Sequence, residues 1–184
     1  VNAVARTAGA PVSPEGRNWF WAADDGRLTY RDAAGKVQTP LPVLAGPHQP
    51  GNLALAIAML HHQKTLTIPP DAFVAAAEHA TWPARMQLLS DGPLTRLLPS
   101  GSEIWLDGGH NAAAGASVAA ALREVLDHRE TDSAHMIVGM LSNKDPAGLL
   151  QPFAGLAASF HAVPVGGHEC HSAEVLGAVA RDIG

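Results

Sequence analysis

The pattern of apolar residues changes along the chain, and its first stretch is typical of short strands separated by turns. Trp19-Phe20-Trp21 and Leu28-Thr29-Tyr30 flank the turn Asp24-Asp25-Gly26. A second turn, Ala34-Gly35-Lys36, leads to Val37 and to a further apolar run at residues 41–44. Apolar runs joined by turns of this kind predict antiparallel hairpins.

Helical spacing replaces this pattern after about residue 47. One apolar face is formed by Leu53, Ala56, Ile57 and Leu60. This spacing of three and four residues predicts a helix. Pro70 suits the first turn of a second helix, with Phe73, Val74 and Ala77 facing inward. Trp82-Pro83 follows as a linker, because the residue before a proline is disfavoured in a helix. We therefore expect two domains, residues 1–81 and 82–184.

The remainder of the chain alternates between predicted strands and predicted helices. The strands are expected at residues 86–89, 103–106, 135–140 and 159–165. Helices are expected to begin near Asn111, at Asp145-Pro146 with Asp145 as the cap, and after the cap Ser172. This alternation predicts an α/β domain with a Rossmann-like, mostly parallel, doubly wound sheet.

Composition and charge exclude several classes of partner. The chain has 184 residues, a formal net charge of −5 and no basic run, which argues against nucleic acid and anionic membranes. The longest apolar run, residues 53–60, is too short to cross a bilayer. A single cysteine, Cys170, excludes an internal disulfide framework and suits the cytoplasm. We expect small-molecule partners and a monomer.

The most informative segment is Ile104-Trp105-Leu106-Asp107-Gly108-Gly109-His110-Asn111. It reads as a buried strand that ends at an aspartate, followed by a glycine turn and the start of a helix. Parallel α/β proteins bind ligands at such strand ends. Asp107 is suited to accept from ribose hydroxyls, and His110 to contact a phosphate oxygen. An ordinary helix cap with a solvated histidine fits the spacing equally well.

Three further positions are candidates, each with a plain structural alternative. Lys144, in the segment 139–145 that leads from a strand into a helix, is suited to hold a carboxylate or phosphate, or is simply solvated. Asn52 is a helix-cap residue whose amide can also read an adenine edge. Arg85 can reach a nucleotide phosphate or base, although a lone surface arginine is more often solvated.

Two histidine-containing segments and one missing motif limit the chemistry further. His168-Glu169-Cys170-His171 is too closely spaced for the usual zinc sites and reads as a polar loop. His61-His62, near a helix end, is compatible with the helix dipole. The phosphate loop G-x-x-x-x-G-K-[ST] is absent, so a cradle for ATP phosphates would lie elsewhere.

The order of these motifs is more specific than any one of them. His48-Gln49-x-x-Asn52, Trp82-Pro83-x-Arg85, Leu106-Asp107-Gly108-Gly109-His110-Asn111 and Gly139-Met140-Leu141-x-x-Lys144-Asp145 occur in sequence. Together they resemble the folylpolyglutamate synthase/dihydrofolate synthase family of the Mur ligase superfamily. The resemblance covers nearly the whole chain, which is similar to the C-terminal part of such an enzyme: residues 1–81 resemble the tail of the central ATPase domain, and 82–184 the C-terminal domain.

The resemblance implies an ATP-dependent ligase that joins L-glutamate to dihydropteroate or to a folate glutamate chain through an acyl phosphate. It implies that Asn52 and Arg85 contact ATP, that Asp107 lies at the ribose, and that His110 is the catalytic residue near the transferred phosphate. Lys144 would face the incoming glutamate. The phosphate loop and the main Mg²⁺ ligands would lie upstream, which leaves no metal ligand here and implies that the chain alone is inactive.

Some positions depart from the family, and two other functions remain open. Ala84 stands where glycine is common, Ala112 where proline is common, and Asn143 where aspartate is frequent. One alternative is another ligase of the superfamily, acting on a peptidoglycan precursor or a polyamide. The other is a Rossmann-like binding module without chemistry.

Overall fold

The computed structural model of the chain describes residues 2–127 and 133–184. The chain divides into two compact units, which are described separately. Unit 1 comprises Val1–Leu44 and His48–Thr81, and unit 2 comprises Ala45–Pro47 and Trp82–Gly184. Within the described ranges, none of the helices has the length and apolar character needed to cross a membrane.

Unit 1 is built on an antiparallel three-stranded meander, as the turn pattern predicts. After a short helix α1 (Asn2–Thr7), the strands β1 (Trp19–Asp24), β2 (Arg27–Asp32) and β3 (Gly35–Pro40) pair in the order β1-β2-β3. Asp25 and Gly26 turn the chain between β1 and β2, and both have positive φ, +47° and +71°. Two consecutive positive φ angles match the right-handed twist of the flanking strands.

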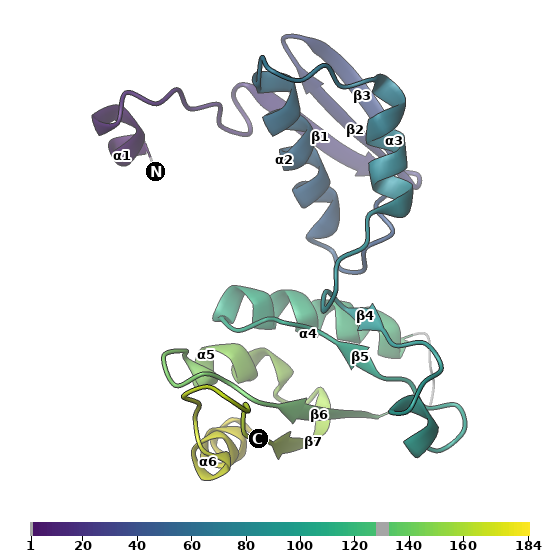
Figure 1. Ribbon diagram of the computed structural model, residues 1–184, viewed down its shortest axis with the longest axis vertical. Coiled ribbons are helices and arrows are strands. Elements are labelled where there is room, and N and C mark those ends of the chain that lie inside the picture. The colour runs from purple at the N-terminus through teal and green to yellow at the C-terminus, as the bar shows by residue number, and fades with distance from the viewer. Residues whose placement is uncertain (1, 128–132) are drawn as a thin grey trace. The chain divides into compact units, whose positions relative to one another are not determined.

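Two helices, α2 (Gln49–His62) and α3 (Pro70–His79), cover one face of this meander (Figure 1). The buried core between the layers contains Trp19, Leu28, Tyr30, Ala54, Ile57, Ala58 and Phe73. The apolar face of α2 differs from the predicted one, because Ala56 is exposed while Ala54 and Ala58 are buried. This rotation places His61 towards the sheet, where it hydrogen-bonds to Asp32. Residues 41–44 form no strand, since β3 ends at Pro40.

Unit 2 has the α/β architecture that the sequence predicts. The strands β6 (Ala134–Val138) and β7 (Ala157–Ala162) are parallel, with Met136 opposite Phe160. The short strands β4 (Gln87–Leu88) and β5 (Trp105–Leu106) form a separate antiparallel pair. The predicted mostly parallel sheet is therefore represented in the described residues by one parallel pair, because β5 hydrogen-bonds to β4 and not to β6.

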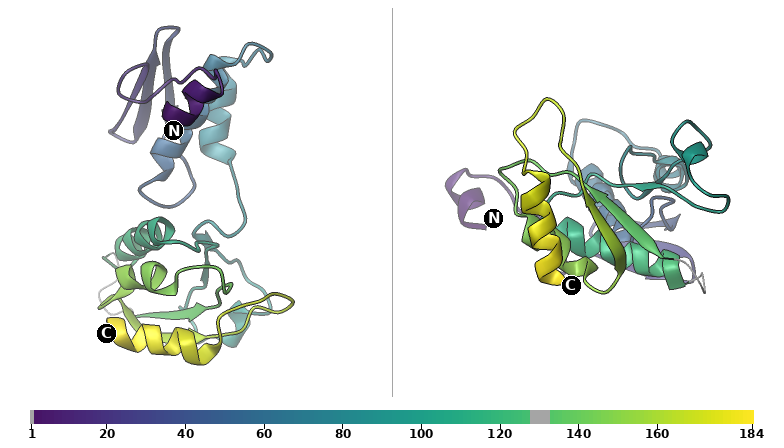
Figure 2. Two further views of the ribbon diagram at one scale, coloured as in Figure 1. Left: turned by 90° about the vertical axis from the view of Figure 1, so that its left-hand side faces the viewer. Right: turned by 90° about the horizontal axis from the view of Figure 1, so that it is seen from below.

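Helices α4 (Ala112–Asp127), α5 (Pro146–Leu150) and α6 (Ala173–Ile183) complete unit 2 (Figure 2). Short 3-10 turns lie at Thr95–Leu97 and Gln151–Phe153. The core contains Val138, Met140, Leu149, Leu150, Leu176 and Ala180. Ser172 caps α6 as predicted, since its Oγ accepts from the Val175 amide at 3.4 Å. Asp145 occupies the cap position of α5, but no capping hydrogen bond from its carboxylate is found in the described structure.

Helices α4 and α5 approach each other closely through two glycines. A side chain at Gly115 would collide with the backbone of Leu149. A side chain at Gly148 would lie 3.2 Å from Cβ of Ala112, the first residue of α4. The beginnings of α4 and α5 therefore adjoin, and the loops that lead into them end side by side.

Candidate active site

The turn Asp107-Gly108-Gly109 gathers three of the predicted site residues around Gly108. The Gly108 amide donates to the Ala84 carbonyl at 2.9 Å. The Gly108 carbonyl accepts from His110 Nδ1 at 3.1 Å. The Arg85 guanidinium lies against the same residue, because a Cβ on Gly108 would be 3.4 Å from Arg85 Nη1. Asp107, Arg85 and His110 therefore form a single cluster at the end of β5.

Asp107 holds this cluster through both oxygens of its carboxylate. Its Oδ2 accepts from the Met86 amide at 2.8 Å, and its Oδ1 accepts from the Gly109 amide at 2.6 Å. Each carboxylate oxygen can accept a second hydrogen bond. The same side chain can thus tie two backbone segments together and still accept from a ligand hydroxyl.

Arg85 is presented by a strained piece of backbone. Its two neighbours, Ala84 and Met86, have φ of +52° and +41°, a region that residues other than glycine rarely adopt. Such a conformation persists only where other contacts impose it. Here the contacts are two hydrogen bonds: the Met86 amide donates to Asp107 Oδ2, and the Ala84 amide donates to Gln87 Oε1 at 2.9 Å. The segment 84–87 therefore fixes where Arg85 leaves the backbone.

His110 and Asn111 follow the turn and begin α4. A carbonyl can only accept, so Nδ1 of His110 carries the proton in its bond to Gly108. This leaves Nε2 as the available ring atom, and it has no partner among the described residues. Asn111 caps the helix, since its Oδ1 accepts from the Ala114 amide at 2.9 Å. Exposed His110 thus stands beside a helix N-terminus, which favours anionic groups.

The loop that carries Lys144 is held by the segment before α6. The Ser142 amide donates to the Glu169 carbonyl at 3.1 Å, and the His171 amide donates to the Met140 carbonyl at 2.9 Å. His171 Nε2 also donates to the Lys144 carbonyl, at 2.9 Å. The half-buried Lys144 therefore has an ordered backbone at the start of α5.

His171 was not recognised as a site residue from the sequence, where residues 168–171 read only as a polar loop. Its contact partner lies 27 positions away, which no local motif reveals. Among the described residues, no group of three or more His, Cys, Asp or Glu side chains is arranged to hold a metal ion.

Asn52 lies in unit 1, in the first turn of α2, and is exposed. Its Nδ2 donates to Gln49 Oε1 at 3.1 Å, and Gln49 Nε2 contacts His48 Nε2 at the same distance. The buried Gln49 is a second residue that the sequence did not mark as part of the site. The other four candidates, Arg85, Asp107, His110 and Lys144, belong to unit 2.

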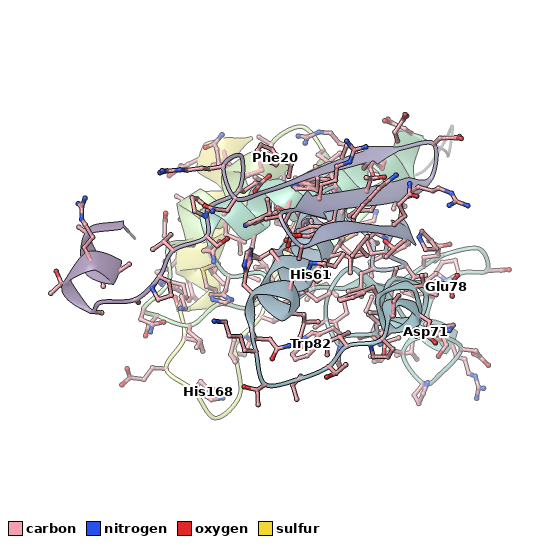
Figure 3. All side chains as sticks on the ribbon, turned by 90° about the horizontal axis from the view of Figure 1, so that it is seen from above. Phe20, His61, Asp71, Glu78, Trp82 and His168 are labelled. Carbon is pink, nitrogen blue, oxygen red and sulfur yellow. The ribbon has the colours of Figure 1, made fainter. Side chains whose placement is uncertain are left out.

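A buried polar network in unit 1 was also missed from the sequence. Asp32 Oδ2 accepts from the Tyr30 hydroxyl at 2.9 Å and contacts His61 Nδ1 at 3.0 Å. Figure 3 shows His61 projecting from α2 towards the sheet. Burial, with a smaller contribution from Asp32, raises the pKa of Tyr30. Burial works against the Asp32 carboxylate, but hydrogen bonds from Tyr30 and His61 lower its pKa overall, aided by two backbone amides.

Comparison with curated proteins finds relatives of one kind. The chain is 28% identical over 144 residues to the folylpolyglutamate synthase of Lacticaseibacillus casei, covering 77% of this chain and 31% of that protein. It is 25% identical over 174 residues to the dihydrofolate synthase/folylpolyglutamate synthase of Escherichia coli (strain K12), covering 94% and 37%. The chain thus spans about a third of the length of these relatives. No protein-family model matches it.

Solved structures give the same result for the fold. E. coli FolC in complex with ADP, without folate substrate, matches with a TM-score of 0.75 and 25% identity, over 98% of this chain and 40% of that one. The Mycobacterium tuberculosis folylpolyglutamate synthase complexed with ADP and AMPPCP also matches in fold, with a TM-score of 0.75.

Proposed function

We propose that the chain is part of an ATP-dependent carbon–nitrogen ligase, because its relatives and structural neighbours are folylpolyglutamate and dihydrofolate synthases and it corresponds to their C-terminal portion. The reaction would add L-glutamate to dihydropteroate or to a folyl(poly)glutamate. ATP would phosphorylate the acceptor carboxylate, the glutamate amine would attack the acyl phosphate, and phosphate would leave. Residues 1–81 would be the end of the ATPase domain, and 82–184 the C-terminal ligase domain.

The Gly108 turn is the observation that carries this proposal. It brings Arg85, Asp107 and His110 to one backbone group at the start of a helix. A guanidinium, a helix N-terminus and an imidazole whose Nε2 also carries a proton together stabilise negative charge, which is what transfer of a phosphoryl group to a carboxylate requires. Arg85 would contact ATP, Asp107 would accept from its ribose, and His110 would act at the transferred phosphate.

Two further residues are assigned roles in the proposed reaction. Lys144 would bind a carboxylate of the incoming glutamate, and its ordered loop at the start of α5, which adjoins the start of α4, supports this role. Asn52 would contact the adenine of ATP through its exposed amide, which offers both a donor and an acceptor.

Mg²⁺ would accompany the ATP phosphates, and we propose that its ligands and the phosphate loop come from polypeptide outside these 184 residues. The ligase would work as a monomer in the cytoplasm, on small-molecule substrates alone. The 184-residue chain by itself would give no glutamate-dependent phosphate release from ATP.

The decisive experiment is an assay of phosphate release in the intact polypeptide that contains this chain, with ATP, L-glutamate and either dihydropteroate or a reduced folate. His110→Ala should lower kcat on the order of 10²–10³-fold, as the loss of a preorganised charge-stabilising group does in other enzymes. His168→Ala is the matched control, because His168 is also an exposed histidine but lies in the loop before α6.

The outcome also separates this function from its rivals. Unchanged turnover in a folded His110→Ala protein would contradict the ligase site and favour a binding module. Turnover that requires an amino acid but neither pteroate nor folate acceptor would point to another ligase of the superfamily. Glutamate-dependent phosphate release by the isolated 184-residue chain would show that the proposed outside residues are not needed.

A further inference from the structure

We propose that Gln49 determines nucleotide specificity by fixing the orientation of the Asn52 amide, so that this amide complements adenine and not guanine. The inference rests on the proposed function, in which Asn52 contacts ATP. It adds Gln49 to the residues involved in nucleotide binding, as a residue that does not contact the nucleotide but positions Asn52.

Gln49 is a buried amide with a bonding partner at each end. It is only 5% exposed, at the first position of α2. Its Nε2 donates to His48 Nε2 at 3.1 Å, and its Oε1 accepts from Asn52 Nδ2 at 3.1 Å. An amide nitrogen can only donate, so Nε2 of His48 is the acceptor. A buried polar group is costly unless it is hydrogen-bonded. With the ring proton of His48 on Nδ1, which is buried and has no partner among the described residues, these two bonds hold the Gln49 amide in one orientation.

The fixed Gln49 amide prevents Asn52 from turning its own side-chain amide over, as an exposed asparagine otherwise can. The two ends of an asparagine amide are similar in shape, and the side chain can turn over to exchange its donor and its acceptor. Because Gln49 presents an oxygen, Asn52 must direct Nδ2 towards it. The Asn52 Oδ1 and the second N–H then remain available, and their order along the amide edge is set.

Adenine and guanine differ in the order of the same groups. Adenine presents a donor at N6 beside an acceptor ring nitrogen, whereas guanine presents an acceptor at O6 beside a donor at N1. When both bases are held by the nucleotide's ribose and phosphates with the same face towards the amide, a fixed amide that pairs with both groups of one base meets like groups on the other. Bidentate pairing of asparagine with adenine discriminates between bases by about tenfold or more. Without Gln49, Asn52 could turn to suit either base.

The test is a titration of the isotope-labelled intact polypeptide that contains this chain with ATP and, separately, with GTP. Binding is followed by the side-chain Nδ2 resonances of Asn52, which report even weak binding. The native chain should bind ATP about tenfold more tightly than GTP. Gln49→Met should remove most of this preference. Gln49→Glu should retain it, because a carboxylate still accepts from Asn52 Nδ2. Gln38→Leu, at an exposed glutamine of β3, is the control and should change neither affinity.

The possible failures are distinguishable. If neither nucleotide shifts Asn52 in the native chain, the proposed ATP contact is wrong and this inference falls with it. If Asn52→Ala, followed by the backbone amide resonances of α2, loses ATP binding but Gln49→Met keeps the native preference, Asn52 contacts ATP and only the role of Gln49 is wrong. If Gln49→Met loses the dispersed spectrum of unit 1, Gln49→Glu decides alone: a retained preference supports the inference, and a lost one overturns it.

Discussion

Some residues in the candidate site have a structural role that their sequence motif does not reveal. Asp107 stands where a strand-end carboxylate would meet a ligand, yet both of its oxygens already accept from backbone amides. One of these bonds holds Met86 and the other closes the glycine turn. Removing the carboxylate would therefore release Arg85 and His110 together, so loss of activity in an Asp107 variant cannot by itself assign a ribose contact. His110, whose Nε2 is available, is the more selective probe.

Ala84 offers a direct test of the strain beside Arg85. Its φ of +52° costs an alanine roughly 1–2 kcal/mol, a penalty that glycine does not have. Glycine also loses more backbone entropy on folding, about 0.5–1 kcal/mol. We expect Ala84→Gly to stabilise unit 2 by about 0.5–1 kcal/mol. Urea unfolding followed by the indole N–H resonance of Trp105, in β5, measures the change.

A control substitution, Ala116→Gly, should change the stability of unit 2 in the opposite direction. Ala116 is exposed within α4, where glycine is less favourable than alanine by about 1 kcal/mol. Ala116→Gly should therefore destabilise the same unit. Equal destabilisation by both substitutions would mean that the backbone at Ala84 is not strained.

At the scale of elements, the sequence predicts what depends on local pattern and not what depends on distant pairing. The hairpins around Asp25-Gly26 and the helix capped by Ser172 follow from turn and cap chemistry within a few residues. The pairing of β4 with β5 does not, because each strand has two residues and too little pattern to show its partner. The inward rotation of α2 is set by the contact of His61 with Asp32, which lies 29 positions earlier.

The candidate site divides in the same way. Asp107, His110 and Arg85 could be proposed as site residues because glycine turns, strand ends and the order of motifs are visible in the sequence. Gln49 and His171 were overlooked as site residues because their roles consist of contacts with Asn52 and with the Lys144 carbonyl. A buried glutamine at a helix start and a histidine in a polar loop have no pattern that distinguishes them.

The close contact between α4 and α5 predicts that alanine at Gly115 lowers stability, whereas alanine at Gly177, outside this contact, raises it. At Gly115 the added Cβ would meet the Leu149 backbone, which cannot move aside as a side chain can. Overpacking of this kind costs about 1–3 kcal/mol. At Gly177, in α6, the nearest atom is the end of the Arg181 side chain at 3.5 Å, so alanine should stabilise the helix by up to about 1 kcal/mol.

Thermal unfolding of the two variants measures both effects. Gly115→Ala should also displace the starts of α4 and α5 relative to each other, and with them His110 and Lys144. Stabilisation by Gly115→Ala would contradict the close helix contact.

At the scale of the whole molecule, the response to acid should be dominated by one buried carboxylate. The pKa is lowered for Asp32, Asp91 and Glu174. Asp91 pairs with Arg96 in a contact where both side chains are more than two-thirds exposed, at 73% and 69%. Such surface pairs contribute little to stability. The Asp32 side chain is 1% exposed and joins the β2–β3 turn to α2, so its protonation affects the packing of unit 1.

The sign of the pH dependence follows from the lowered pKa. Below about pH 4, the usual value for an unfolded aspartate, the unfolded chain binds a proton that folded Asp32 resists. The contribution of Asp32 to stability is therefore complete above that pH and is lost as the pH falls through its folded pKa. Asp32→Asn should destabilise unit 1 at neutral pH by about 1–3 kcal/mol, because it weakens a buried hydrogen-bond network. It should also flatten the dependence of stability on pH below about pH 4.

Urea unfolding from pH 7 down to acid, followed by the Trp19 indole N–H that donates to the Ser13 carbonyl, reports on unit 1. Asp91→Asn is the control and should leave both the stability and its pH dependence nearly unchanged, since its partner Arg96 is exposed. If Asp32→Asn and the native chain lost stability in parallel on acidification, another group would have to account for the acid response. Because Asp32 contacts α2, whose first turn contains Gln49 and Asn52, unfolding of this network would also displace the Asn52 amide that we propose to contact adenine.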